Sequence, residues 1–316
     1  MARYSSCIHR SLLDRQTCLR VLPAVLLALL AGGCGDPSLE EPDAPQELAS
    51  QASELREGNG LGSNGLGSNG LGSNGLGSNG LSLSTLNSAS FVDWFNQDPA
   101  LADMVMSYVT ACAVSHGSSL TWTNPVTNTT HKWNGNLGLT PGWAGGAPAT
   151  ELEQQLITAC LAAHTNKYGV KVNISIQGLK ANNSPIPVGW GEFSIFAQKE
   201  ACFFGNLFQN EGIFAGNDSY LLSTQSSVRA CGLEVAGAGD QCAPIHHVSN
   251  CSALCTPDYA HNYFQTCYYN GKSYRALTTR IKKSDVYVCG DGVCQISESC
   301  GTGFTPNNCR DCGPCP

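Results

Sequence analysis

Charged side chains are scarce in this chain, since Asp, Glu, Lys and Arg together make up 13% of its 316 residues. Acids outnumber bases, and the formal net charge of −7 excludes a generally basic nucleic-acid-binding protein, so we expect no nucleic-acid partner. The sequence also lacks a Gly-x-Ser-x-Gly elbow, a His-Glu-x-x-His motif, a phosphate-binding Gly-Lys loop and a Rossmann glycine pattern. We therefore expect no enzyme of those classes, and neither a cofactor nor a metal.

Long apolar runs are missing as well. The run Val21–Leu30 has ten residues, which is too short to span a bilayer but suits the core of a signal peptide. Arginines dominate the segment before it, and small residues lead from it to Cys34. This arrangement resembles the lipobox of bacterial lipoproteins. The resemblance implies that residues 1–33 are a signal peptide and that a lipidated Cys34 anchors the chain to a membrane.

The residues around Cys34 refine this expectation. Gly35 stands where an inner-membrane retention signal would have Asp, so the resemblance implies the outer membrane or the cell surface within the envelope. Ala31 occupies a place at which Leu is commoner. A secreted, unanchored protein cleaved near Gly33 by ordinary signal peptidase is therefore the alternative.

Residues 34–83 combine two low-complexity patterns. Seven acids and one base lie between positions 35 and 57, and Asn-Gly-Leu-Gly-Ser repeats with a period of five follow. Self-repulsion, few large side chains and frequent glycine all oppose packing. A period of five matches neither a helix nor a strand face, and the repeats end too early for a stacked β-helix. We interpret the segment as a disordered tether that holds the folded part away from the membrane.

Residues 84–288 carry the patterns of a folded α+β domain. Asp98 before Pro99 predicts the start of one helix. Thr150 and Glu153 have the spacing of a capping box and predict a second helix, with Gly169 as its stop.

Strand patterns lie between and after these helices. Apolar and polar residues alternate from Val170 to Ile176, which predicts a half-buried strand. Leu120–Trp133 is typical of a hairpin, and Asn270-Gly271 between two aromatic segments predicts a hairpin with a two-residue turn.

Cysteine is abundant, with 17 residues, and so many cysteines indicate an oxidising compartment. Loss of Cys7 and Cys18 with the signal peptide and lipidation of Cys34 leave an even number in each of two regions, so we expect full pairing within each region. The cysteines of the α+β domain are Cys112, Cys160, Cys202, Cys231, Cys242, Cys251, Cys255 and Cys267. Those of residues 289–316 are Cys289, Cys294, Cys300, Cys309, Cys312 and Cys315. The sequence leaves the partners open.

A short sequence is repeated in the domain. Cys112 with His116 and Cys160 with His164 both follow an apolar residue and Thr-Ala, at a spacing that shares one helix face. The four side chains have the composition of a Cys₂His₂ zinc site. We favour a Cys112–Cys160 disulfide between two packed helices, because thiols pair in an oxidising compartment.

Residues 289–316 carry six cysteines and almost no core-forming side chains, which predicts a disulfide-stapled mini-domain. The Cys289-to-Cys294 motif and the closing Cys309-to-Cys315 motif resemble a Cys-rich module at the end of many secreted bacterial proteins. With the repeat tether and the lipobox, the whole chain resembles myxobacterial-type surface lipoproteins. This resemblance does not indicate which activity the middle domain has.

Asp291 and Glu298 keep half of an EF-hand loop's spacing, and we favour a turn over a calcium site.

Three further groups have both a functional and a structural interpretation. His246-His247 suit a base, a metal ligand or a solvated turn. Glu192 or Glu200 together with Glu211 suit a glycosidase pair or a set of surface acids. A basic-aromatic segment suits an anionic glycan or lipid headgroup, or the polar face of a hairpin, which we favour. This segment contains Tyr268, Tyr269, Lys272, Tyr274, Arg275, Arg280, Lys282 and Lys283.

These observations indicate a cell-envelope lipoprotein that displays a disulfide-locked domain on a flexible stalk. We expect a binding or structural role toward a surface polysaccharide or protein. The alternative is a tethered extracellular hydrolase whose acids and histidines meet only after folding.

Overall fold

The computed structural model describes residues 57–59, 74–166, 172–218, 221–229 and 244–316. The chain divides into the units Met1–Ala44 and Pro45–Pro316, and every described residue belongs to the second. The predicted signal peptide, Cys34, Cys231 and Cys242 lie outside the described residues. Within the described ranges, no helix has the length and apolar character that a membrane span requires.

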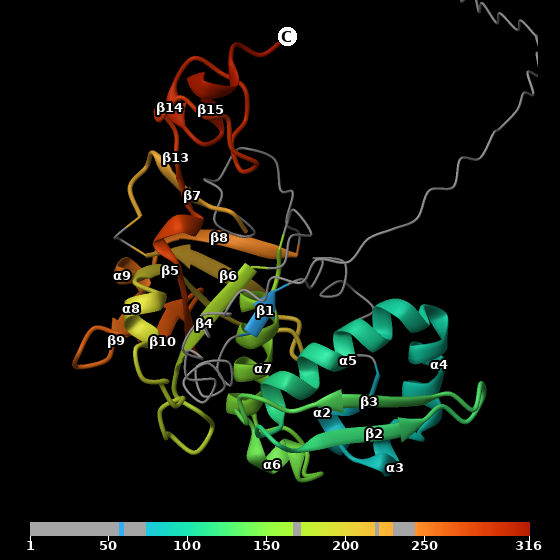
Figure 1. Cartoon of the computed structure of the whole chain (residues 1–316). Coiled ribbons are helices and arrows are strands. Elements are labelled where there is room, and N and C mark those ends of the chain that lie inside the picture. Colours follow the sequence, from blue (N-terminus) through green and yellow to red (C-terminus); the bar gives the residue numbers. More distant parts are fainter. Residues whose placement is uncertain (1–56, 60–73, 167–171, 219–220, 230–243) are drawn as a thin grey trace, which may run out of the picture. The chain divides into compact units, whose positions relative to one another are not determined.

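The largest sheet has six strands (Figure 1). Their spatial order is β1 (Glu57–Asn59), β4 (Val172–Gly178), β12 (Leu277–Ile281), β5 (Gln198–Asn206), β6 (Gly212–Asn217) and β8 (Ile245–Asn250). Neighbouring strands are antiparallel except for β6 and β8, which run parallel. Because β12 comes late in the chain and still lies between β4 and β5, the middle of the sheet depends on contacts between distant segments.

The predicted strand is present as β4, but it is not half-exposed. Ser175, which the alternation placed on a solvent face, is fully buried. The short helix α8 (Glu192–Ile195) brings a buried carboxylate over this face. Ser175 Oγ donates to Glu192 Oε1 at 2.5 Å, and Gln177 Nε2 donates to the same oxygen at 3.0 Å. Ser175 and Gln177 are therefore buried because a carboxylate satisfies them, whereas Asn173 is exposed, as the alternation predicts.

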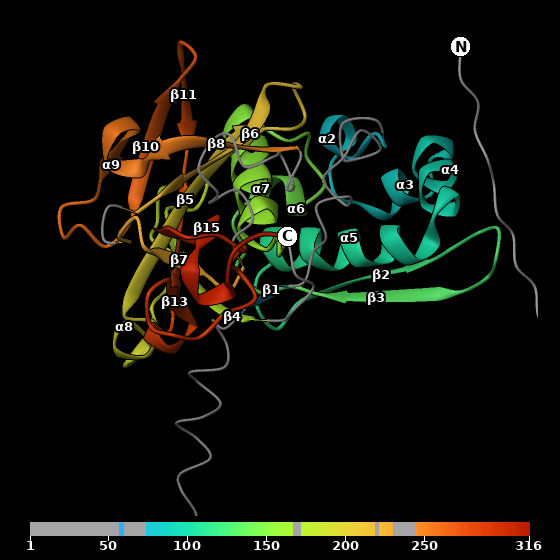
Figure 2. The same cartoon turned by 90° about the horizontal axis from the view of Figure 1, so that it is seen from above.

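Helices pack on one face of the sheet. α7 (Glu151–Ala163) contacts β5, and α5 (Pro99–Ala113) contacts α7. Figure 2 shows α7 between the strands and α5. The apolar faces of both helices belong to one large core with the sheet residues Ile174 and Phe203.

Both predicted helix starts are confirmed by their cap hydrogen bonds. Asp98 Oδ1 accepts from Leu101 N at 3.1 Å. Thr150 Oγ1 accepts from Glu153 N at 3.3 Å, and Glu153 Oε2 accepts from Thr150 N at 3.0 Å. α7 ends at Ala163, before the predicted stop at Gly169, which lies outside the described residues.

The first predicted hairpin is also confirmed. It consists of β2 (Ser119–Thr123) and β3 (Thr130–Asn134), and β3 packs on α5. Aromatic rings of α4 (Ala89–Gln97) pack on the hairpin, with the centroids of Phe95 and Trp122 4.9 Å apart. These contacts join the hairpin to the large core.

The fold includes residues that were predicted to be tether. α2 (Leu76–Asn79) and α3 (Leu83–Leu86) precede the helical layer, and Leu76 is completely buried. Trp143 Nε1, on α6 (Pro141–Ala144), donates to the Leu76 carbonyl at 2.7 Å. The tether assignment for 34–83 is therefore wrong for residues 57–59, which pair with β4, and for residues 74–83, which Leu76 and Leu81 anchor in the core.

A three-stranded sheet lies over a second apolar cluster that includes Phe204, Phe214 and Tyr274. Its strands are β9 (Cys255–Pro257), β10 (Phe264–Tyr269) and β11 (Lys272–Arg275), and α9 (Cys251–Leu254) precedes them. The predicted second hairpin joins β10 to β11. Its turn residues Asn270 and Gly271 have φ values of 50° and 79°, as a two-residue turn of this kind requires.

Short elements follow toward the C-terminus. After the 3₁₀ turn η2 (Lys283–Asp285), β13 (Val286–Val288) pairs with β7 (Gln225–Ser227), which comes earlier in the chain. The disulfide-held module then contains β14 (Phe304–Thr305) paired with β15 (Asn308–Cys309), and the 3₁₀ turn η3 (Arg310–Cys312). Helices and mostly antiparallel strands make the described structure α+β, with a small disulfide-rich C-terminal module, as the sequence predicts.

Candidate functional sites

The described cysteines form six disulfides, and none of these cysteines is unpaired. In the α+β domain the pairs are Cys112–Cys160, Cys202–Cys251 and Cys255–Cys267. In the C-terminal module they are Cys289–Cys309, Cys294–Cys312 and Cys300–Cys315. Each described pair stays within its own region, which agrees with the even number of cysteines in each.

The repeated Cys–His pattern does not form a zinc site. Cys112 and Cys160 are bonded to each other, so neither sulfur is a thiolate ligand. His164 caps the end of α7, and its Nδ1 donates to the Cys160 carbonyl at 2.7 Å. His116 lies beyond the last residue of α5 and is exposed. The disulfide connects α5 to α7 inside the core.

Glu192, Glu200 and Glu211, the three candidates for a glycosidase pair, each contact a different set of residues. Glu200 is buried and pairs with Arg229, which also donates to the Ala163 carbonyl at the end of α7. Burial by itself would raise the pKa of Glu200, but the charge of Arg229 and hydrogen bonds from Arg229, Ser227 and Thr279 hold that pKa below its ordinary value.

Glu192 and Glu211 are engaged elsewhere. Besides Ser175 and Gln177, Glu192 accepts from Gly189 N at 2.7 Å. Glu211 forms an ion pair with Lys272. The acids therefore stabilise three different parts of the fold, and their arrangement gives the hydrolase alternative no specific support.

His246 and His247 lie on β8 rather than in a turn. Successive strand residues point to opposite faces, so the two rings do not share one site. His247 Nε2 contacts Asn217 Oδ1 at 3.1 Å, and burial lowers the pKa of His247.

The basic-aromatic segment is not a single binding face. Tyr274 is buried in the second apolar cluster. Arg280 is also buried, and its guanidinium donates to the carbonyls of Phe196 at 2.9 Å and Ala197 at 3.0 Å. Arg275 Nη2 donates to Asn183 Oδ1 at 2.7 Å. Several aromatic and basic side chains of this segment therefore contact the rest of the domain instead of forming an exposed binding surface.

An exposed tryptophan that sequence reasoning missed lies on the loop between β4 and α8. Trp190 exposes 87% of its surface, whereas the other four tryptophans of the chain are buried. The loop backbone is anchored before the ring and across it: Ile186 N donates to the Gly178 carbonyl at 2.9 Å, and Gly189 N donates to the buried side chain of Glu192, which follows Trp190 in the chain. A tryptophan between two glycines after a predicted strand is the signal that could have identified it.

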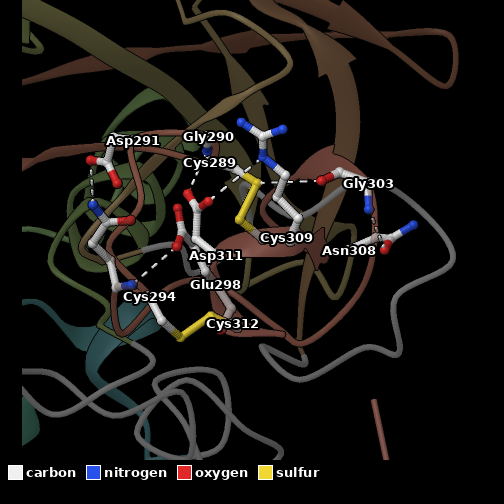
Figure 3. Close-up of a disulfide and its surroundings, with 12 residues drawn as sticks. Cys289, Gly290, Asp291, Cys294, Glu298, Gly303, Asn308, Cys309, Asp311 and Cys312 are labelled. Carbon is white, nitrogen blue, oxygen red and sulfur yellow. Dashed lines mark hydrogen bonds and ion pairs between the residues drawn. A yellow bond between two sulfur atoms is a disulfide. The ribbon is translucent and has the colours of Figure 1, made fainter. Parts of the chain in front are cut away.

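The C-terminal module gathers carboxylates beside its disulfides. In Figure 3, the carboxyl groups of Glu298 and Asp311 lie close together next to the Cys289–Cys309 and Cys294–Cys312 bonds. An oxygen of Glu298 and an oxygen of Asp311 are within 4.8 Å of each other. Glu298 Oε2 accepts from Gln295 N at 3.0 Å, and Asp311 Oδ2 accepts from Gly290 N at 2.5 Å.

The charges of this cluster are poorly compensated. Burial raises the pKa of Glu298, and the nearby carboxylates of Asp311 and Asp291 add to that increase. Arg310 is a base beside the pair: its Nε is 3.9 Å from Asp311 Oδ1, and its guanidinium lies over the Phe304 ring. Sequence spacing singled out Asp291 and Glu298, but not Asp311, which folding brings beside them.

Comparisons of the chain with protein-family models, with curated proteins and with solved structures gave no match.

Proposed function

We propose that this chain is an extracytoplasmic envelope protein that displays a disulfide-locked domain and binds a surface polysaccharide without catalysing a reaction. The observation that carries the proposal is the pairing of every described cysteine. Structural disulfides are formed and kept in oxidising compartments and are rare in the cytosol of mesophiles. The signal-peptide pattern and the lipobox ending at Cys34 supply the export route and the membrane anchor in this proposal.

A binding role fits the exposed tryptophan better than catalysis fits the acids. Exposing a tryptophan on an anchored loop leaves a large apolar ring in water, at a cost in free energy that a bound partner covering the ring would recover. A stable protein partner needs an interface of roughly 1,000 Å² or more, whereas one flat ring suits the apolar face of a sugar in a narrow polysaccharide chain. We therefore assign Trp190 as the main contact in the proposed function.

The location is tested by mass spectrometry of the mature chain purified from its native cell envelope. We expect an N-terminal Cys34 that carries acyl chains. Alkylation without reduction is expected to label essentially no cysteine. An unacylated N-terminus at another position, or several labelled cysteines per chain, would contradict the proposed anchoring or the proposed compartment.

The binding role is tested by titrating the purified chain with polysaccharide extracted from the same envelope. Because the other tryptophans are buried, a change in intrinsic fluorescence on binding reports mainly on Trp190. We expect Trp190→Ala to abolish both the fluorescence change and retention on the immobilised polysaccharide. Tyr259→Ala, which removes another fully exposed ring, is the matched control and should bind normally. Equal retention of the two variants would contradict the role of Trp190.

A further inference from the structure

Trp190 stands at the corner of a tight turn. Glu192 N donates to the Gly189 carbonyl at 3.1 Å, so the turn closes with Trp190 at its second position. Gly191, at the third position, has a φ of 75° and a ψ of 0°, whereas the φ of Trp190 is not positive. These values are typical of a type II turn, in which the third residue needs a positive φ and is usually glycine. The exposed ring therefore starts from a defined backbone position.

The side chain of Glu192 fastens this turn to the large sheet. Its Oε2 accepts from Gly189 N at 2.7 Å, so the first and last residues of the turn are bonded in both directions. Its Oε1 accepts from Ser175 and Gln177 of β4. Glu192 is only 7% exposed, so little water competes for these bonds. The backbone of Trp190 is therefore ordered before a ligand arrives, and binding does not have to order it.

The segment that presents the ring offers no exposed charge. Glu192 is the only charged residue within residues 185–197, and its carboxylate is buried. Val188 and Ile195, before and after Trp190 in the chain, expose 41% and 37% of their surfaces. An anionic polymer would find no cation in this segment, and the formal net charge of −7 would oppose its approach.

Two bases close to this segment are engaged within the fold. The guanidinium of Arg280 donates to the Phe196 carbonyl at 2.9 Å and lies over the Phe193 ring, with 4.8 Å between Cζ and the ring centroid. Lys199, which follows α8 in the chain, forms an ion pair with the buried Asp218. Both cations thus have partners in the protein, so they give an anionic ligand little additional attraction.

We propose that the Trp190 site binds an uncharged polysaccharide, with the apolar face of one pyranose ring stacked on the indole that the turn presents. The C–H groups of that face carry a slight positive charge, and the π face of an indole is negative. The hydroxyl groups at the sugar's edge stay in water, so they need no partner in the protein. The inference rests on the proposed function, and it adds the class of polysaccharide and two positioning residues, Gly191 and Glu192.

The class of ligand is tested by separating the envelope polysaccharide on an anion exchanger into a neutral and an anionic pool. Each pool is titrated into the full oxidised chain, and tryptophan fluorescence is followed. We expect the neutral pool to bind, with a dissociation constant that changes by less than about twofold between about 0.01 M and about 1 M NaCl, where the Debye length falls from about 30 Å to about 3 Å.

Two results of this titration would overturn the inference. Binding that is confined to the anionic pool, or that weakens steeply with salt, would refute the uncharged class but would keep Trp190 as the contact if Trp190→Ala abolishes it. Binding of neither pool would contradict the proposed function as well.

The role of the turn is tested with a matched pair of glycine variants. No atom lies within 4 Å of a Cβ added at Gly191, whose φ is 75°, or at Gly117, whose φ is 79°. Gly191→Ala and Gly117→Ala should therefore lower the thermal midpoint by similar amounts, since both impose the same backbone strain. Only Gly191→Ala should weaken binding of the neutral pool, by about two- to tenfold, because the ring loses its preset position.

Equal affinity of these two variants would overturn the positioning role of the turn. Near-ultraviolet circular dichroism reports on the buried tryptophans and shows whether each variant has folded. A misfolded chain is thereby distinguished from a displaced ring.

Discussion

Replacing Arg229 by Met removes the cation that neutralises a completely buried carboxylate. Glu200 has no exposed surface, and Arg229 donates to it through Nε at 3.1 Å and through Nη2. The same guanidinium donates to the carbonyl of Ala163, the last residue of α7, and to that of Thr165 just beyond it. The substitution therefore leaves the buried carboxylate without its cation, although Thr279 Oγ1 still donates to it, and it removes a donor from two carbonyls.

The expected cost is large. Breaking a buried ion pair by removing one partner costs about 3–5 kcal/mol, because the other charge stays desolvated. A denaturant dependence of about 2–3 kcal/mol per M converts this loss into a urea midpoint lower by about 1–2.5 M. Urea unfolding without reductant, followed by tryptophan fluorescence, measures the shift.

The cost should depend on pH. In the unaltered chain the pKa of Glu200 is below its ordinary value, so its stabilising contribution is present above that ordinary value and is lost as pH falls through the lowered pKa. In Arg229→Met, we expect burial to raise the pKa of Glu200, because the cation that opposed this effect is gone. Its folded form then gains stability by binding a proton, and it loses that stability as pH rises through the raised pKa. The difference between the two chains should therefore be larger at pH 7 than at pH 5.

Two controls separate the ion pair from general damage. Lys132→Met removes an exposed cation and should change stability by no more than about 0.5 kcal/mol. The double variant Glu200→Gln with Arg229→Met has no buried charge and should recover part of the loss. A cost of less than about 1 kcal/mol for Arg229→Met, or a cost that is the same at pH 5 and pH 7, would refute the reasoning.

Two further predictions concern the helical layer. Leu76→Ala should destabilise the chain by about 2–5 kcal/mol, because Leu76 is fully buried, whereas Leu83→Ala, at an exposed leucine, should have little effect in the same urea assay. Equal effects would mean that Leu76 does not belong to the core. Removing the Cys112–Cys160 disulfide by replacing both cysteines with Ala should cost about 4 kcal/mol, since it closes a loop with a sequence separation of 48. Thermal unfolding measures that loss, and an unchanged midpoint would contradict the proposed role of the cross-link.

The elements that could be predicted are those with local signals. Caps at Asp98 and Thr150 mark helix starts because the hydrogen bonds they make reach only three residues along the chain. The Asn270-Gly271 turn is equally local, because positive φ values restrict which residues fit. Such signals are readable without knowledge of any distant contact.

Predictions that needed distant partners were incomplete or wrong. The repeat pattern around Leu76 resembles a flexible spacer, and only the indole of Trp143 and the surrounding core make it part of the fold. Ser175 has the position of a solvent-facing residue, and only Glu192 makes its burial possible. Charge and periodicity contain no information about such partners.

The sequence by itself determined the α+β character, the main helix starts, the hairpins and the even division of the cysteines, because these follow from neighbouring residues and from counting. Tertiary structure alone decided which cysteines pair, where the tether ends, that Arg280 is buried, and that Trp190 is exposed. It also decided that Asp311 lies beside Glu298. The physical reason is that burial and close pairing of charges depend on atoms brought together from distant parts of the chain, and their energies exist only once those atoms meet.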